Sequence, residues 1–207
     1  MKKLLYIVLT LIALLLLYLR FSYGDNSQKL PSNNPSTTPA STVSPESKMQ
    51  VNLTEKLDNA YFTLSHDKDA TTSTSRSPDS QEWVISYMGE EQKKSGRTQT
   101  ELWDGYMISI TRFETVGEDP DQKQAEADRS GIVDGCGKDK STPIKAGKLG
   151  EYDTLTFYGG CLGEADYYYI MRADTLYRLT VMTVGSAELK PKYQRMVGAM
   201  LDSLSFK

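Results

Sequence analysis

The chain has 207 residues, of which 39% are hydrophobic and 25% are charged, and its net charge at pH 7 is −3. A net negative chain repels the phosphates of nucleic acids, so a nucleic-acid partner is not expected. A single histidine and two cysteines leave few nucleophile or metal-ligand constellations to consider.

Residues 1–24 predict insertion into a membrane. Lys2 and Lys3 precede an apolar run at residues 4–19, which Arg20 closes. Two interpretations stay open: an uncleaved membrane anchor, or a signal peptide that is cut after Gly24. Because the basic start stays in the cytoplasm, we expect a single-pass cell-membrane protein with its C-terminal domain outside, or a secreted domain after cleavage.

Residues 25–50 are rich in Ser, Thr, Pro and Asn and contain little that could be buried. Such a segment cannot offset the entropy lost on ordering, so we expect a disordered linker between membrane and domain. An O-glycosylated stalk is the alternative interpretation. Asn52 begins an Asn-x-Thr acceptor pattern, whose use depends on the host.

Residues 51–207 have the usual size of one domain, and strand signals dominate its first half. Runs rich in β-branched and aromatic residues predict strands at residues 61–64, 83–88 and 106–113. The polar, Ser- and Thr-rich residues 66–80 are expected to form a long loop, in which His66 would be exposed.

The second half of the domain combines two helices with further strands. Asp119 and Pro120 are expected to begin the first helix, as cap and first helical residue, and Gly131 to end it. The second helix lies within residues 188–201, where an apolar stripe recurs every three or four positions. Strands are expected at residues 143–147, 151–158, 165–172 and 176–184, with a tight turn at 174–175 that allows only antiparallel pairing.

This order predicts an α+β fold: an antiparallel sheet with two helices packed on it. The pattern of residues 61–64, 105–110, 177–181 and 201–206 resembles the PsbP-like domain, a family named for an extrinsic subunit of the photosynthetic oxygen-evolving complex. The resemblance implies an α-β-α sandwich of the kind found in exported binding or assembly proteins, generally without an enzymatic site. The long loop and the cysteine pair depart from the family pattern, so no photosynthetic role is carried over.

Cys136 and Cys161 both fall in the domain, and each has glycine neighbours. Two cysteines in an oxidising compartment usually pair, so we expect a structural disulfide. A redox pair would more often be Cys-x-x-Cys, and a metal site would need further ligands nearby; both remain weaker alternatives.

No catalytic residue, metal site or cofactor is predicted. A nucleophilic triad would have to use His66, and no nucleophile elbow, zinc-protease helix or phosphate-binding loop occurs in the sequence. The acidic residues 118–121 suit a helix N-terminus, with a weak Ca²⁺ site as the alternative. Asp166 is interpreted as a solubilising charge at a sheet edge.

Tyrosine is the one over-used residue type, with 13 in the chain. On the predicted late strands, one face would present tyrosines to solvent, as binding surfaces often do. The predicted binding surface comprises Tyr152, Tyr158, Tyr167, Tyr168 and Tyr169, with ordinary cross-strand packing as the alternative. We therefore expect a non-enzymatic, membrane-tethered domain that binds a protein partner or small ligand. A cell-envelope hydrolase using carboxylates, or a structural surface component, is the alternative.

Overall fold

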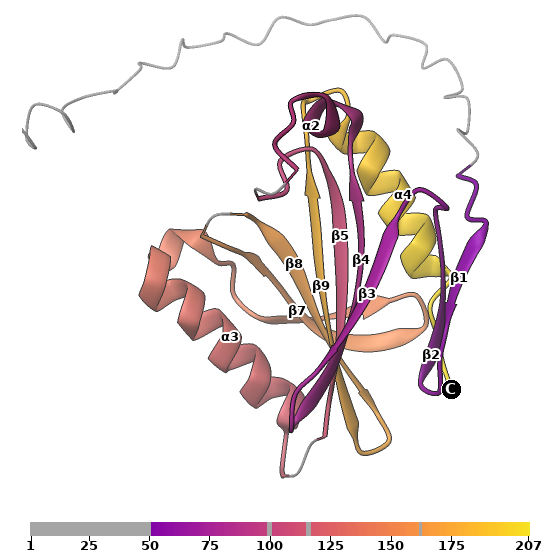
Figure 1. Cartoon of the computed structure of the whole chain (residues 1–207). Helices are drawn as coiled ribbons and strands as arrows, with labels where there is room; N and C mark the ends of the chain where they lie inside the picture. Colours follow the sequence, from indigo (N-terminus) through magenta and orange to yellow (C-terminus); the bar gives the residue numbers. More distant parts are fainter. Residues whose placement is uncertain (1–50, 99–100, 115–116, 162) are drawn as a thin grey trace, which may run out of the picture. The chain divides into compact units, whose positions relative to one another are not determined.

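A computed structural model describes residues 51–98, 101–114, 117–161 and 163–207 (Figure 1). The predicted anchor or signal peptide and the predicted linker lie outside these residues. Within the described ranges, no helix has both the length and the apolar character needed to cross a bilayer.

A seven-stranded sheet forms the centre of the domain, and each strand runs antiparallel to its neighbours. Two groups of strands, each consecutive in the chain, meet where β5 (Gly105–Phe113) pairs with β9 (Thr175–Val184). From edge to edge, the strands are β3 (Thr71–Arg76), β4 (Ser80–Met88), β5 (Gly105–Phe113), β9 (Thr175–Val184), β8 (Ala165–Arg172), β7 (Tyr152–Gly159) and β6 (Lys145–Leu149).

The central strand β5 shows why the two faces of this sheet differ. Side chains alternate along a strand, so Tyr106, Ile108 and Ile110 point to one face and are fully buried. Ser109 and Thr111 point to the other face, which is more polar. The alternation that predicted this strand therefore also determines which face carries the main core.

Helix α4 (Lys190–Asp202) covers the apolar face of the sheet, to which it contributes Tyr193, Val197 and Met200. A small three-stranded sheet extends the same layer, and its last strand follows α4 directly. Its strands, in spatial order, are β1 (Glu55–Asp58), β2 (Phe62–His66) and β10 (Ser205–Phe206).

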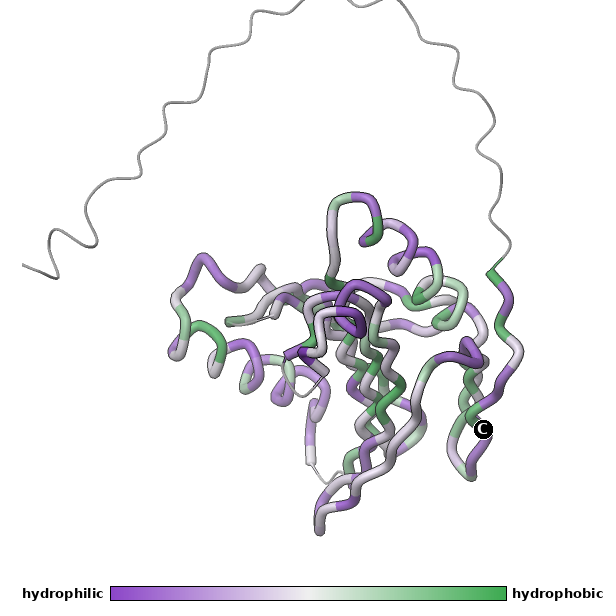
Figure 2. Tube along the Cα trace, turned by 45° about the horizontal axis from the view of Figure 1, so that its top comes forward, coloured by the Kyte–Doolittle hydropathy of each residue, from purple (hydrophilic) through white to green (hydrophobic). Residues whose placement is uncertain are grey.

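Helix α3 (Pro120–Cys136) lies on the opposite side of the large sheet from α4 (Figure 1). It packs Ala125 in a second, smaller core with Phe157, Tyr169 and Leu176. Figure 2 shows hydrophobic colouring concentrated on the central strands, whereas α3 is largely hydrophilic. A mostly antiparallel sheet with helices packed on it confirms the predicted α+β class.

The structure corrects the predicted limits of α3. The helix continues through Gly131 and ends at Cys136, because Ile132 still packs on the second core beyond that glycine. Asp119 occupies the N-cap position, but its side chain makes no capping hydrogen bond and its φ is 48°. The turn between β8 and β9 also differs by one residue, since Ala173 adopts the left-handed conformation there, with a φ of 49°.

The predicted loop at residues 66–80 is wrong, because it contains the edge strand β3. All six residues of β3 are exposed, so no apolar alternation marks it, and it is held by backbone pairing with β4. A short helix, α2 (Glu90–Lys94), was not predicted either, so the described residues hold three α-helices rather than two. His66 ends β2, and it is only 7% exposed rather than lying in a loop.

Candidate functional site

The structure separates the five tyrosines of the predicted binding surface. Tyr152 and Tyr169 are only 8% and 0% exposed, so neither can present a ring to a partner. Tyr152 packs against Phe206 with 5.1 Å between ring centroids. The Tyr169 hydroxyl donates a 2.7 Å hydrogen bond to Asp128 of α3. Burial and this hydrogen bond both raise the pKa of Tyr169.

Tyr167 is half-buried on the same face as Tyr169. Its ring stacks on Phe157 with 4.6 Å between centroids, so it belongs to the second core. The five tyrosines therefore do not form a single exposed surface. Tyr152, Tyr167 and Tyr169 are packing residues, which was the alternative interpretation, and the half-buried Tyr168 packs partly against the main core.

The other two tyrosines, Tyr158 and Tyr168, lie on the opposite face of the sheet. Tyr158 of β7 is opposite Asp166 of β8, and Thr156 is opposite Tyr168. Positions two apart along a strand share a face, so these four side chains line one surface. They border a cavity of about 440 Å³, which we call the tyrosine groove; its lining is Thr142, Pro143, Lys145, Thr156, Phe157, Tyr158, Asp166 and Tyr168.

One wall of the tyrosine groove is a loop held tightly against β7. The Thr142 amide donates to the Tyr158 carbonyl at 2.8 Å, and the Tyr158 amide donates to the Thr142 hydroxyl at 2.9 Å. A Cβ at Gly159 would lie 2.8 Å from the Lys140 carbonyl, so only glycine allows this close approach. These bonds place Pro143 at the edge of the groove.

The predicted disulfide is confirmed, and it closes the segment that contributes most of this lining. Cys136 at the end of α3 is bonded to Cys161 after β7, with 5.5 Å between their Cα atoms. Thr142, Lys145 and Tyr158 all lie between the two cysteines in sequence. The disulfide therefore limits how far the loop wall can move away from the strands.

The charged groups of the groove have distinct environments. Burial raises the pKa of the Asp166 carboxyl, and the nearby Lys145 and Lys190 partly offset this effect. The Tyr158 hydroxyl donates a hydrogen bond to Glu164, which together with burial raises the pKa of Tyr158 to about 12. The groove thus offers an aromatic surface with one carboxyl, one amine and two neutral phenols.

Sequence reasoning found Tyr158 and Tyr168 but missed their partners. Asp166 was interpreted as a solubilising edge charge, although it lies two positions before Tyr168 and so had to share its face. Thr142 and Pro143 carried no signal, because their approach depends on the folded loop. Outside the groove, His66 is held at the end of β2, where its Nδ1 lies 2.8 Å from the Asp67 carbonyl oxygen.

Comparisons with known proteins provide no family for this chain. No family model matches it, and no curated protein matches it. Among solved structures, a crystal structure from Bacteroides thetaiotaomicron VPI-5482 is similar, with 11% sequence identity and a TM-score of 0.37. The alignment covers 75% of this chain and 49% of that one, so the chain spans about half the length of this neighbour.

Proposed function

We propose that this chain is a membrane-tethered, extracytoplasmic domain of PsbP-like type that binds a partner protein in the tyrosine groove. The tether rests on the basic start and apolar run of residues 1–24. The PsbP-like assignment rests on the order of elements and is supported by helices on opposite sides of an antiparallel sheet.

The groove itself is the observation that carries the binding role. Tyr158 is 37% exposed, and within the described ranges only Trp103, at 39%, is another large hydrophobic residue so exposed. Tyrosine rings contribute large contact areas at little entropic cost, which makes them common anchors in interfaces. Asp166 and Lys145 beside them would orient a partner that carries complementary charges.

A segment of a protein is the occupant that the groove fits best. Its wall is a loop paired to β7, and its floor is a sheet surface, so an extended chain can lie along it. The Thr156 and Tyr168 side chains supply hydroxyl groups along it. A small ligand is the alternative occupant, and the expected absence of enzymatic activity and of cofactors stays a prediction.

Site-specific crosslinking in the source cells tests this proposal. A photoreactive phenylalanine analogue at position 158 of the full-length chain should capture one partner protein, and the crosslinked product should sediment with membranes. The same analogue at position 103 is the matched control, because Trp103 is equally exposed but lies outside the groove.

The captured partner then allows a quantitative test. Its affinity for the purified full-length protein should fall about tenfold or more with Tyr158→Ala, whereas Trp103→Ala should leave it unchanged. Equal crosslinking from both positions, or an affinity that Tyr158→Ala does not change, would contradict the proposed groove. A crosslinked product that stays soluble would contradict the tether alone.

A further inference from the structure

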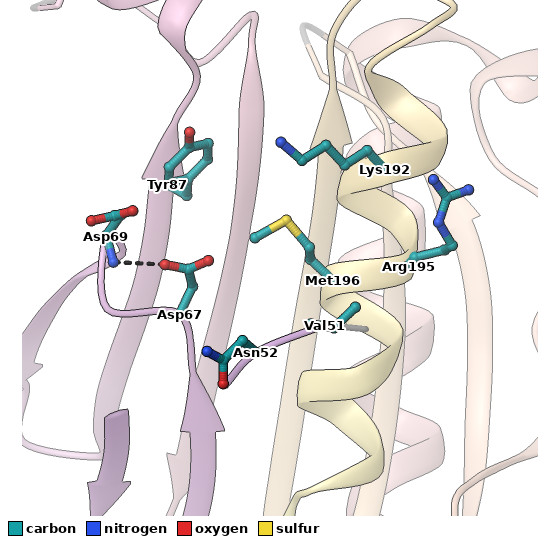
Figure 3. A pocket seen from close by; sticks show the side chains of 8 residues that line it. All are labelled: Val51, Asn52, Asp67, Asp69, Tyr87, Lys192, Arg195 and Met196. Atoms are coloured by element: carbon teal, nitrogen blue, oxygen red, sulfur yellow. Dashed lines mark hydrogen bonds between the residues drawn. The ribbon is translucent and has the colours of Figure 1, made fainter. Parts of the chain in front are cut away.

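A second cavity, separate from the tyrosine groove, lies between α4 and the turn that joins β2 to β3 (Figure 3). Its volume is about 220 Å³, smaller than the roughly 300 Å³ at which pockets for drug-sized ligands begin. We call it the charged cleft. It is lined by Val51, Asn52, Asp67, Asp69, Tyr87, Lys192, Arg195 and Met196.

Opposite charges face each other across this cleft. In Figure 3, the Asp67 carboxylate lies on the wall formed by the β2–β3 turn, and Lys192 extends from α4 toward Tyr87. Among the residues that the structure describes, neither Asp67 nor Lys192 forms an ion pair, nor does Arg195 at the rim. One ligand that carries both a positive and a negative group could therefore pair with Asp67 and Lys192 at the same time.

The turn holds the acidic wall in place. The Asp69 amide donates a 2.7 Å hydrogen bond to one oxygen of the Asp67 carboxylate, which fixes that side chain and leaves its second oxygen available. Asp69 itself has a cationic neighbour, because Lys68 contacts it at 3.2 Å. Asp67 is therefore the acidic group that a ligand would meet.

Besides the charged residues, the lining consists of the polar Asn52 and of Val51, Tyr87 and Met196, which are apolar or aromatic. Met196 extends into the space between the two charged walls in Figure 3, and Val51 lies at its lower side. Tyr87 is fixed by stacking on Tyr106, with 5.5 Å between ring centroids. Burial raises the pKa of Tyr87, so its hydroxyl stays neutral and available for hydrogen bonding.

We infer that the charged cleft binds a small zwitterion of the amino-acid class with an apolar side chain. The ligand's ammonium group would pair with Asp67, its carboxylate with Lys192, and its side chain would contact Met196 and Tyr87. A ligand with only one charge would pair with only one of the two walls. This site shares no residue with the tyrosine groove and does not depend on it.

Titration of the full-length protein with L-leucine tests the inference. Calorimetry should give one site per chain, and the methyl signal of Met196 in NMR spectra should shift on binding. Asp67→Asn and Lys192→Gln should each weaken binding about tenfold or more, because each removes a charged hydrogen bond. The Asp67→Asn variant keeps a side-chain oxygen that can accept the Asp69 amide, so the turn should survive.

Matched control variants, and leucine analogues that carry only one of its two charges, complete the test. Asp153→Asn and Lys148→Gln remove an exposed ion pair outside the cleft and should leave the affinity unchanged. Isoamylamine and 4-methylpentanoate each carry one of the two charges of leucine and should bind more weakly than leucine itself. The inference is overturned if L-leucine, L-valine and L-methionine all fail to bind at millimolar concentration, or if neither cleft variant weakens binding.

Discussion

Tyr106 and Tyr193 occupy the same core, with ring centroids 6.4 Å apart, but their hydroxyl groups have different surroundings. The Tyr193 hydroxyl donates a 2.8 Å hydrogen bond to Asp104, whose other oxygen accepts the amides of Glu91 and Gln92. The Tyr106 hydroxyl is buried and has no hydrogen-bond partner among the described residues. Replacing each tyrosine by phenylalanine should therefore change the free energy of unfolding differently at the two positions.

Tyr193→Phe should lower the free energy of unfolding by about 1–3 kcal/mol, because Asp104 is fully buried and would lose a donor. Tyr106→Phe should leave the free energy unchanged or raise it by up to about 1 kcal/mol, since it removes an unpaired buried group. Urea unfolding of both variants, followed by circular dichroism, measures the difference. Equal losses in the two variants would show that the Asp104 hydrogen bond does not distinguish them.

At the scale of elements, the disulfide determines how α3 is held on the sheet. The helix has a mostly polar composition, and only Ala125 is fully buried among its residues. Besides this small apolar contact, Asp128 of α3 accepts the Tyr169 hydroxyl and pairs with Arg178 of β9 at 2.9 Å. Arg129 donates to the Thr142 carbonyl. The bond from Cys136 to Cys161 adds a covalent link at the end of the helix. The C-terminal end of the helix lies beyond Gly131, and this is the end that the disulfide joins to the residue after β7.

Replacing both cysteines by serine should therefore destabilise the domain by roughly 3 kcal/mol, the loop-closure value for a segment of this length. Amide hydrogen exchange should accelerate most in the last turns of α3 and in the loop that forms the groove wall. Measurements with and without reductant on the natural protein provide the comparison. Unchanged exchange in α3 would mean that the sheet contacts alone hold the helix.

The sequence predicted those elements whose buried residues recur with the period of a strand or a helix. β5 and α4 each place apolar residues at the spacing of one buried face, so their type and limits were correct to within a few residues. β3 is held by backbone pairing and exposed hydroxyl hydrogen bonds to β4, without buried apolar residues, so its six exposed Ser, Thr and Arg residues resemble a loop in sequence. The extension of α3 beyond Gly131 depends on tertiary contacts that no local pattern contains.

In the candidate sites too, the sequence predicted what depends on local periodicity and missed what depends on tertiary contacts. Tyr158 and Tyr168 could be singled out because strand alternation predicts which side chains share a face. Whether a face is covered depends on where the helices lie, so sequence reasoning could not separate these two from the buried Tyr152 and Tyr169. The charged cleft joins Val51 and Asn52 to residues of β4, the β2–β3 turn and α4, and no motif links those segments.

At the scale of the whole molecule, buried tyrosines should make the free energy of unfolding fall at alkaline pH. Burial raises the pKa of Tyr106, and burial together with hydrogen bonds to carboxylates raises the pKa values of Tyr169 and Tyr193 above the ordinary 10.0. These groups stay protonated in the folded state at a pH where the unfolded chain has lost their protons. Their contribution to the free energy of unfolding is therefore complete below pH 10. It is lost as the pH rises through the pKa values that these tyrosines have in the folded state.

The free energy of unfolding should thus fall steeply above about pH 10, by up to roughly 1.4 kcal/mol per pH unit for each such tyrosine. Urea unfolding at successive pH values gives the slope, and absorbance at 295 nm should show tyrosinate appearing together with unfolding. Tyr106→Phe should make the slope shallower, whereas Lys148→Gln, which changes an exposed amine, should leave it unchanged. A slope that Tyr106→Phe does not alter would mean that the buried phenol ionises without unfolding the chain.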